Sequence, residues 1–317
     1  MRKFLFASLL FAMACTKKDA VVAPSLSSQS SSNITVSTTK FGVLPYGVNT
    51  IDNKIKAATS LGVSCVRYGL SIADWRGKSY DVEKYQTAGF KILMNIMNQN
   101  TIVGQPIPFP TDMVSYRQTV DAMTTKYKYE MVVVENEELN ATIHIVDIPR
   151  YIKMIQTAVD VCHSKGIPVT NGGLYGQALE VLTYRWYVTV NPNAANTWAN
   201  SFMGDHELKA AKAKPGERGY DATLEAGIVD MKTLINAYDI LDYINIHPYE
   251  TLNRKLTTSS QQGAQTTSIV YNVLNPIQQY LTAMTGRPVI TNETGIRNNK
   301  QTALVTSLVN QYLQLNW

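Results

Sequence analysis

From Phe41 onward, short apolar runs alternate with longer stretches in which apolar residues recur every three or four positions. The short runs are rich in β-branched residues and predict strands near residues 41–46, 63–68, 91–96, 131–135, 167–171, 241–246 and 287–292. The longer stretches predict helices at residues 50–61, 80–88, 112–127, 148–165, 223–238, 267–285 and 300–315. This alternation indicates an α/β protein in which helical crossovers connect the strands of a parallel sheet.

Glycines mark the passage from helix to strand. Gly62, Gly89, Gly166 and Gly286 each stand between a predicted helix and the strand that follows it. A helix commonly ends in a left-handed residue there, a conformation that glycine adopts without a steric penalty. The repeated order of helix, glycine and strand supports the predicted α/β organisation.

The parallel sheet is expected to close into a (β/α)8 TIM barrel over residues 40–317. An open dinucleotide-binding sheet would carry a glycine-rich phosphate turn after its first strand, and Pro45 lies where that turn would be. The chain length also suits a single barrel, which needs about 250 residues. The pattern predicts seven strands, however, so the eighth is missing or truncated at the C-terminus, or escapes the pattern, or the barrel is incomplete.

The N-terminus reads as an export signal. Residues 1–14 combine Arg2 and Lys3 with an apolar stretch of ten residues, which is too short to span a membrane as a helix. The following Cys15 stands in a segment that resembles a bacterial lipoprotein box, and residues 16–19 resemble the start of lipoproteins from the Bacteroidetes. We therefore expect Cys15 to be lipidated, with ordinary secretory cleavage as the alternative.

The expected product is a cell envelope lipoprotein, exported to the periplasm or the outer-membrane surface and attached to the membrane through Cys15. Residues 15–39 are rich in Ser, Thr, Ala and Val, which is typical of a flexible tether. Cys65 and Cys162 lie in apolar segments and are expected to be buried thiols.

Charge and histidine content exclude several classes of partner. The net charge is only +5 and no long basic run occurs, so nucleic-acid binding is not expected. The four histidines do not form a ligand pattern, and no metal or other cofactor is predicted. We expect a monomer that acts on a carbohydrate.

Polar side chains gather where predicted strands end, which in a barrel is the rim that carries catalytic groups. Glu135-Asn136-Glu137-Glu138 follows the fourth strand, and Asn292-Glu293 follows the seventh. His247-Pro248-Tyr249 follows the sixth strand, and Arg67 lies at the end of the second. Two glutamates, each preceded by Asn at a strand end of one barrel, form a more specific pattern than either alone.

These motifs together resemble glycoside hydrolase clan A, the retaining (β/α)8-barrel glycosidases, over residues 41 to about 300. The resemblance implies that Glu137 is the general acid/base and Glu293 the nucleophile. It also implies that Arg67 and the His-x-Tyr motif at His247 and Tyr249 support the site.

The chain departs from the pattern of the clan in two places. Glu138 stands where the clan commonly has Pro, which leaves Glu135 and Glu138 as rivals of Glu137. Because side chains alternate along a strand, Glu135 and Glu137 are expected to share a face. The tryptophan that usually follows strand eight has no counterpart here.

The implied reaction is hydrolysis of a β-linked poly- or oligosaccharide by double displacement. Glu137 would need a raised pKa, which an ionised Glu293 nearby would provide. Arg67 would keep Glu293 ionised, Tyr249 would orient it, and Asn136 would bond a sugar hydroxyl. His247 would contact substrate or Tyr249, or be a packed histidine bonded to backbone.

Sugar faces stack on aromatic rings, so Tyr46, Trp75, Trp186 and Trp198 are candidate substrate contacts, although the last two could anchor an insertion instead. That insertion is the long segment of residues 172–221, which is expected to decorate the cleft. Asn171 ends strand five beside it. Alternative functions are a catalytically lapsed barrel that binds glycans without cleaving them, and a barrel enzyme of another class such as a lyase or metal hydrolase.

Overall fold

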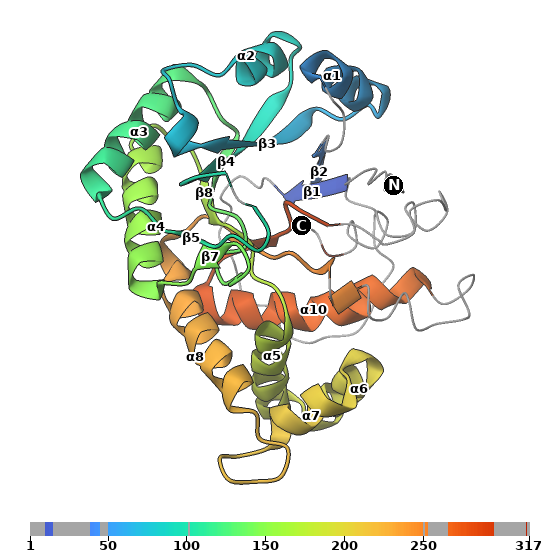
Figure 1. Ribbon diagram of the computed structural model, residues 1–317. Coiled ribbons are helices and arrows are strands. Elements are labelled where there is room, and N and C mark those ends of the chain that lie inside the picture. The colour runs from blue at the N-terminus through green and yellow to red at the C-terminus, as the bar shows by residue number, and fades with distance from the viewer. Residues whose placement is uncertain are drawn as a thin grey trace, which may run out of the picture.

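The computed structural model describes residues 10–14, 39–44, 50–100, 102–249, 251–252, 266–294 and 315 (Figure 1). The strands are β1 (Leu10–Ala14), β2 (Thr39–Val43), β3 (Cys65–Ser71), β4 (Lys91–Met97), β5 (Ile107–Pro108), β6 (Met131–Val134), β7 (His144–Ile145), β8 (Val169–Asn171), β9 (Ile244–Asn245) and β10 (Val289–Ile290). The helices are α1 (Ile51–Ser60), α2 (Tyr80–Thr87), α3 (Met113–Lys126), α4 (Ile148–His163), α5 (Gln177–Val190), α6 (Pro192–Phe202), α7 (Asp205–Lys212), α8 (Ala222–Asn236) and α10 (Thr266–Thr285), with short 3₁₀ turns η1 (Ile72–Asp74) and η2 (Tyr238–Ile240).

The central strands form a parallel sheet in the order β2-β3-β4-β6-β8. Parallel bridges between Thr170 and Tyr243 and between Leu174 and Ile246 continue it to β9, and β9 pairs in parallel with β10. Each new strand is therefore added beside the previous one in chain order. This order confirms an α/β fold with a parallel sheet.

The sheet curls until its distant strands face a common interior. Buried side chains from β3, β4, β6 and β10, together with Tyr243 next to β9, form one compact cluster: Cys65, Leu93, Met131, Val133, Tyr243 and Ile290. Contact between Cys65 of β3 and side chains near the other end of the strand order requires a strongly curved sheet. Strand β1 pairs antiparallel with β2 and also contacts β10.

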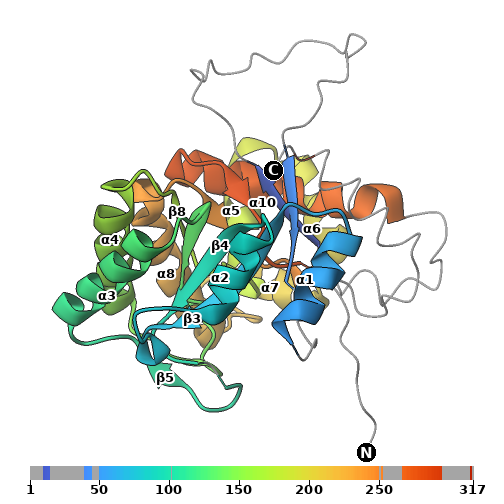
Figure 2. The same ribbon diagram turned by 90° about the horizontal axis from the view of Figure 1, so that it is seen from above.

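Helices cover the outside of the curved sheet. Figure 2 shows α2, α3 and α4 outside β3, β4 and β8. The main hydrophobic core lies between these layers; its largest fully buried side chains include Tyr85, Tyr116 and Tyr151. Among the described helices, none is long and apolar enough to cross a membrane.

The predicted strands and helices within the described residues are present, with ends shifted by a few positions. The four glycines predicted to end helices all have positive φ, between 67° and 85°. The predicted helix at 300–315 lies outside the described residues except for position 315. Cys65 and Cys162 are buried free thiols, as expected.

Most of the segment of residues 172–221 lies away from the cleft that it was predicted to decorate, although Gly173 at its start reaches His247. It forms helices α5, α6 and α7, and α5 packs against α8 and α10 at the bottom of Figure 1. Trp198 anchors this insertion, because its indole is buried and its Nε1–H donates to the carbonyl of Val273 in α10 at 3.1 Å. An amphipathic helix buries its apolar side wherever an apolar partner exists, and here the partner is the outer helical layer.

Candidate active site

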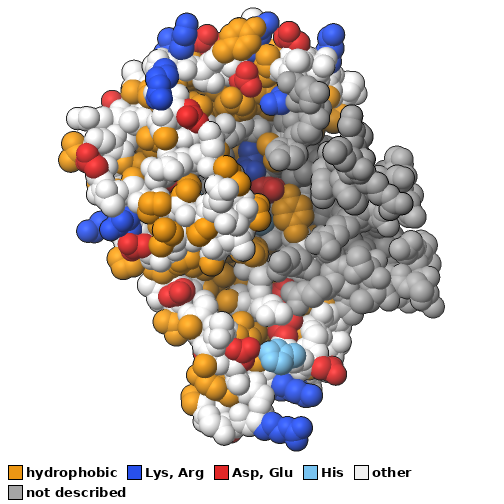
Figure 3. Space-filling model, in the orientation of Figure 1, with side chains coloured by type: hydrophobic (Ala, Val, Ile, Leu, Met, Phe, Trp, Pro, Cys, Tyr) orange, Lys and Arg blue, Asp and Glu red, His pale blue; other side chains and the backbone are white. Residues whose placement is uncertain are grey.

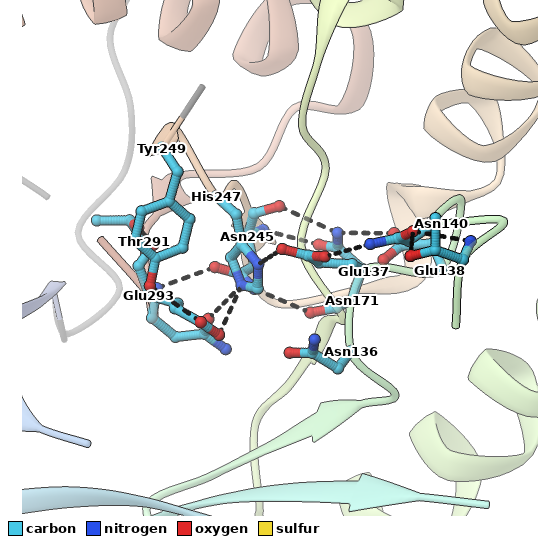
Figure 4. A network of polar contacts seen from close by, with 12 residues as sticks. Asn136, Glu137, Glu138, Asn140, Asn171, Asn245, His247, Tyr249, Thr291 and Glu293 are labelled. Atoms are coloured by element: carbon cyan, nitrogen blue, oxygen red, sulfur yellow. Dashed lines mark hydrogen bonds and ion pairs between the residues drawn. The ribbon is translucent and has the colours of Figure 1, made fainter. Parts of the chain in front are cut away.

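The site gathers residues that follow three strand ends on one side of the sheet (Figure 4): Glu137 follows β6, His247 follows β9, and Glu293 follows β10. Arg67 lies inside β3, which continues to Ser71, and not at the end of its strand as predicted. The carboxyl ends of parallel strands meet at one rim, which is why residues so distant in sequence can touch. The structure thus brings together the four residues around which the sequence predicted a site.

The turn after β6 determines which glutamate reaches the site. The chain leaves the strand at Val134, and both Glu135 and Glu137 adopt left-handed backbone conformations, with φ of 65° and 49°. Non-glycine residues in this region store strain of about 1–3 kcal/mol each, and such strain is typical of functional sites. The expectation that Glu135 and Glu137 share a face was wrong, because the alternation of a strand does not continue through this turn.

The two rival carboxyls point away from the cleft and are fully buried. Glu135 accepts a hydrogen bond from the backbone N–H of Asn98 at 2.6 Å, and burial raises the pKa of Glu135 to about 8. Glu138 accepts hydrogen bonds from Tyr238 and from Asn171, the latter at 3.0 Å, and burial raises the pKa of Glu138 as well. Glu137 is the one of these three glutamates that retains exposure, with 19% of its side chain accessible.

Glu293 is held by two donors. Nη1 of Arg67 lies 2.5 Å from Oε2 of Glu293, and the hydroxyl of Tyr249 donates to Oε1 at 2.9 Å. Burial alone would raise the pKa of Glu293, but the charges of Arg67 and His247 and these hydrogen bonds lower it below its usual value. An ionised carboxylate that is fixed in direction can act as a nucleophile.

Arg67 also orients the neighbour of Glu137. Its side chain is 95% buried, and Nη2 donates to Oδ1 of Asn136 at 2.6 Å. The amide of Asn95 is oriented so that its oxygen accepts from Nη2 of Arg67 at 2.9 Å and its nitrogen donates to the backbone oxygen of Glu135. The backbone oxygen of Asn136 meets Nε2 of His144 at 2.7 Å. A single arginine therefore connects the nucleophile candidate to the strained turn.

Glu137 is tied down by two side chains. Its Oε1 lies 3.2 Å from Nδ1 of His247, and its Oε2 accepts from Nδ2 of Asn140 at 2.8 Å. Burial raises the pKa of Glu137, but the hydrogen bond and charge of His247 and the hydrogen bond of Asn140 outweigh it, so that the pKa is lowered. The prediction that the pKa of Glu137 is raised is therefore wrong for the site without substrate. The charge of Glu293 does raise this pKa, as predicted, but the other effects are larger.

His247 lies between the two carboxylates (Figure 4). Its ring is fully buried; Nδ1 faces Glu137, and Nε2 lies 4.0 Å from Oε2 of Glu293 and 2.8 Å from Oδ1 of Asn292. The Cα of Gly173 packs against this ring, because a Cβ there would fall 2.4 Å from Nε2. The sequence predicted contact with substrate or Tyr249, or a packed histidine bonded to backbone. The rings of His247 and Tyr249 lie edge to face at 6.4 Å, and the hydrogen-bond partners of the His247 ring among the described residues are side chains.

Asn171 is a buried support beneath the site. It is inaccessible to solvent, its Oδ1 accepts from the backbone N–H of Asn245 at 2.7 Å, and its Nδ2 donates to Glu138 and to the Asn245 carbonyl. The side chain of Asn245 in turn accepts from the backbone N–H of Asn292 at 3.0 Å. These bonds hold the ends of β8, β9 and β10 in register.

Trp75 and Trp186, which were proposed to stack on sugar, pack elsewhere. Trp75 lies edge to face with Tyr127 at 6.1 Å, against the outer helices. Trp186 packs against Tyr187 and Tyr280, in the interface between α5 and α10. The structure therefore does not bring either tryptophan to the carboxylate pair. Tyr46 and Cys15 lie outside the described residues.

Asn140, Asn292 and Gly173 complete the site. Asn140 was not predicted, because nothing in a single sequence distinguishes it from a loop residue. Asn292 entered the prediction only as the residue before Glu293, and Gly173 only as a backbone that could approach the substrate. Gly173 follows Gly172 directly, and this pair was the available signal for a close approach of the backbone to another group.

The described residues contain no cluster of metal-binding side chains. No group of three or more His, Cys, Asp or Glu that could hold a metal occurs among them. Figure 3 shows acidic and basic side chains scattered over the described part of one face, and both kinds meet in a hollow near its middle. What the site offers chemically is a fixed carboxylate, a second carboxyl and the donors that hold both.

The chain is similar to known proteins in its structure but matches none in the sequence comparisons. No protein-family model matches the chain, and no curated protein sequence matches it. Among solved structures, a glucosidase from Croceicoccus marinus is similar with a TM-score of 0.46 and 9% identity, over 74% of this chain and 45% of that one. The chain thus spans less than half the length of that glucosidase.

Two further structures have similar scores. A family 1 β-glucosidase from Thermotoga maritima, in complex with isofagomine lactam, has a TM-score of 0.43 and 10% identity, over 83% of this chain and 73% of that one. A β-glucosidase from Exiguobacterium marinum has a TM-score of 0.42 and 13% identity, over 84% and 73%. Scores this low assign neither family nor activity, so function has to be inferred from the side chains of the site.

Proposed function

We propose that this protein is a retaining glycoside hydrolase that cleaves a β-linked poly- or oligosaccharide by double displacement, on a barrel of the (β/α)8 type. The observation that carries the proposal is the contact of Glu137 and Glu293 with opposite nitrogens of one imidazole ring, at 3.2 and 4.0 Å. Two carboxyls that contact one histidine lie close to each other at the rim. Hydrolysis of a glycosidic bond by double displacement uses such a pair of carboxyls, one on either side of the bond.

The environments of the two carboxyls suggest their roles. Glu293 is fixed and ionised by Arg67 and Tyr249, which suits attack on the anomeric carbon. Glu137 is the more adaptable group, because its partners His247 and Asn140 are uncharged or titratable rather than a permanent cation. It would protonate the departing oxygen and then activate the water that releases the sugar.

Asn136 would assist at the neighbouring sugar hydroxyl. Its Oδ1 is occupied by Arg67, and its Nδ2 makes no hydrogen bond to the described residues. A free amide N–H beside the reacting carbon could donate to a hydroxyl oxygen, and this bond would strengthen as charge develops.

A mechanism-based fluorosugar, tried across several sugar types and followed by peptide mapping, tests the nucleophile. We expect covalent label on Glu293, and NMR of the first product should show the anomeric configuration of the substrate. Label on another residue, or an inverted product, would contradict the double displacement.

Glu137→Gln tests the acid/base. Activity on glycosides with poor leaving groups should be abolished, because they need a proton donor, while activated aryl glycosides should be spared much more. Equal loss on both kinds of substrate would count against the role of Glu137. Asp160→Asn, in an exposed ion pair with Arg117, is a control that should leave both activities unchanged.

The lowered pKa of Glu137 favours a second candidate, a barrel that binds glycans without cleaving them. A carboxyl that stays ionised when substrate is bound could not donate a proton. Glycan binding by calorimetry, with no turnover of either activated or unactivated glycosides, would select this function over hydrolysis.

We also propose that the chain is exported as a lipoprotein anchored through Cys15, after removal of residues 1–14. The proposal rests on the N-terminal sequence. Mass spectrometry of the mature N-terminus should find a diacylated or triacylated cysteine, and Cys15→Ser should release the protein from the membrane fraction. An unmodified N-terminus at another residue would point to ordinary secretory cleavage.

A further inference from the structure

Glu137 reaches the cleft from a turn whose backbone is unfavourable on both sides of Asn136. Glu135 and Glu137 have φ of 65° and 49°, a region that few residues with a side chain adopt. Such a conformation persists only where the surrounding contacts hold it in place. The residues that supply those contacts therefore determine where the carboxyl of Glu137 points.

Glu135 attaches the start of this turn to β4. Its backbone N–H donates to the carbonyl of Ile96 at 2.9 Å, which continues the pairing of β4 with β6. The next bond of a parallel ladder would run from the N–H of Asn98 to the backbone oxygen of Glu135. That N–H donates instead to Oε1 of Glu135 at 2.6 Å. The buried carboxyl thus replaces a backbone acceptor at the point where the chain leaves the strand geometry.

Glu138 attaches the other end of the turn to β8 and η2. Its Oε1 accepts from the hydroxyl of Tyr238 and from Nδ2 of Asn171, the latter at 3.0 Å. Asn171 ends β8, which is the neighbour of β6 on the side opposite to β4. The two carboxyls therefore bind donors on opposite sides of the turn, and both are buried.

The turn is also packed directly on the backbone of Gly172. A Cβ at this position would lie 2.9 Å from Oε2 of Glu138, and 3.0 Å from backbone atoms of Val134 and Glu135. Gly172 does not have a positive φ, so a glycine is needed here for space and not for a left-handed backbone. The close fit leaves the Glu138 carboxyl little freedom to turn away from its donors.

We propose that Glu135 and Glu138 are positioning residues, whose buried carboxyls fasten the turn to β4 and to β8 and so hold Glu137 between them in the direction of the cleft. The inference rests on the proposed hydrolysis and adds to it, because neither carboxyl takes part in the chemistry. It gives a role to each of the three glutamates within residues 135–138, of which Glu137 alone retains exposure.

The positioning role requires an acceptor and not a charge. Glu135 and Glu138 bind a backbone N–H, a hydroxyl and an amide N–H, and the amide oxygen of glutamine can accept from the same donors. The methyl group of alanine accepts from none of them. Glutamine and alanine variants at the same position therefore separate the hydrogen bonds from the charge.

The dependence of kcat/KM on the leaving group tests the proposal. Glu135→Ala and Glu138→Ala each release one end of the turn, so that Glu137 is displaced from the departing oxygen. We expect activity on glycosides with poor leaving groups to fall about 10–10²-fold, and activity on 2,4-dinitrophenyl glycosides, which need no proton, to fall less than about threefold. Glu135→Gln and Glu138→Gln should stay within about threefold of the parent on both kinds of glycoside.

A merely structural role gives a different pattern. If the carboxyls only stabilise the fold, the alanine variants unfold more easily, but the folded molecules keep the parental ratio of activities on the two kinds of glycoside. Glu207→Ala is the matched control, because Glu207 is a buried glutamate of α7, outside the turn; it should lose stability and keep the ratio. An unchanged ratio in either alanine variant, or glutamine variants as impaired as the alanine variants, would overturn the proposal.

Tyr238→Phe is a milder test, for the case that Glu138→Ala does not fold. It removes one donor to Glu138 and keeps the buried ring. We expect the ratio to change in the same direction as in Glu138→Ala, by about threefold. A parental ratio in Tyr238→Phe would count against the role of Glu138.

Crystal structures of the full-chain variants provide a readout that needs no turnover. In the alanine variants we expect residue 137 to leave the left-handed region and the contact between Oε1 of Glu137 and Nδ1 of His247, at 3.2 Å in the parent, to be lost. A turn that keeps its parental conformation in both variants would overturn the proposal. A displaced turn together with a parent that hydrolyses no glycoside would instead contradict the proposed hydrolysis and leave the fastening of Glu137 standing.

Discussion

Gly173 and His247 are packed so closely that a Cβ on the glycine would lie 2.4 Å from Nε2 of the imidazole, 2.5 Å from Cδ2 and 2.6 Å from Cε1. The backbone of Gly173 also has a φ of 129°, where a side chain is strained. The absence of a side chain at Gly173 therefore allows the His247 ring to occupy its position between the two carboxylates.

Gly173→Ala should push the ring of His247 out of place. We expect a loss of about 1–3 kcal/mol of unfolding free energy from overpacking, in addition to the backbone penalty, together with at least a tenfold fall in kcat/KM. Denaturant unfolding and steady-state kinetics measure both. Gly216→Ala is the matched control, because it also has positive φ, 85°, but no atom within 4 Å of the added Cβ. Equal losses in the two variants would mean that the ring is not constrained by Gly173.

Arg67→Gln should move the acidic limb of the pH profile to higher pH. Burial raises the pKa of Glu293, and the charge of Arg67 is the largest influence that lowers it. Without that charge Glu293 stays protonated to higher pH, and a protonated carboxyl is not a nucleophile. Tyr249→Phe should give a smaller shift in the same direction, since it removes only one hydrogen bond. An acidic limb that stays in place in Arg67→Gln would show that Arg67 does not govern the ionisation of Glu293.

Asn140→Asp should move the basic limb to higher pH. The substitution keeps the oxygen that accepts from Thr142 but places a second carboxylate where Nδ2 donated to Glu137 at 2.8 Å. Repulsion between like charges raises the pKa of Glu137, so Glu137 stays protonated to higher pH. The comparison variant is Thr142→Val, which loses a hydroxyl contact to Asn140 but leaves the Glu137 contact; it should keep the parental profile.

Glu135→Gln should stabilise the protein at alkaline pH. Burial raises the pKa of Glu135 from 4.5 to about 8, so between these values the folded state binds more protons than the unfolded state. Unfolding free energy must therefore fall as pH rises through that window. The amide avoids this loss, and we expect a gain of about 2–4 kcal/mol at pH 8 that vanishes near pH 4.

Unfolding free energy measured from pH 4 to 8 checks the effect of Glu135→Gln. Glu217→Gln, at an exposed position, is the control and should run parallel to the parent. A Glu135→Gln curve that also runs parallel to the parent would mean that Glu135 is ionised in the folded protein.

The order of the barrel strands and of the helices between them could be predicted, because their apolar runs alternate regularly and because Gly62, Gly89, Gly166 and Gly286 mark helix ends. Helices α5, α6 and α7 and the short strands β1, β5 and β7 lie outside this alternation and were not predicted. The residues of the rim followed from that order, since parallel strands must end on the same side. Glu137, His247 and Glu293 could therefore be predicted to lie together, even though they are far apart in sequence. Arg67 reaches the same rim from inside β3, and its part in the site was predicted through the resemblance to the clan.

The geometry within the rim could not be predicted in the same way. The sequence of residues 135–138 does not indicate that Glu135 and Glu137 adopt positive φ. The prediction that side chains alternate between two faces, as in a strand, therefore failed there. The contacts of Trp186 depend on which surface the insertion covers, and this is decided by packing against α10. The pKa of Glu137 depends on Asn140 and His247 together, and a single sequence does not show that both reach it.

The left-handed backbone at Glu137 has a cost for protein engineering. Glycine would relieve the strain at this position, since it adopts a φ of 49° freely. A search for thermostable variants that ignored activity would thus favour Glu137→Gly, which removes the carboxyl proposed to act as the acid. At this residue stability and catalytic activity therefore conflict. Selection for activity would keep a glutamate in a backbone conformation that is unfavourable for any residue with a side chain.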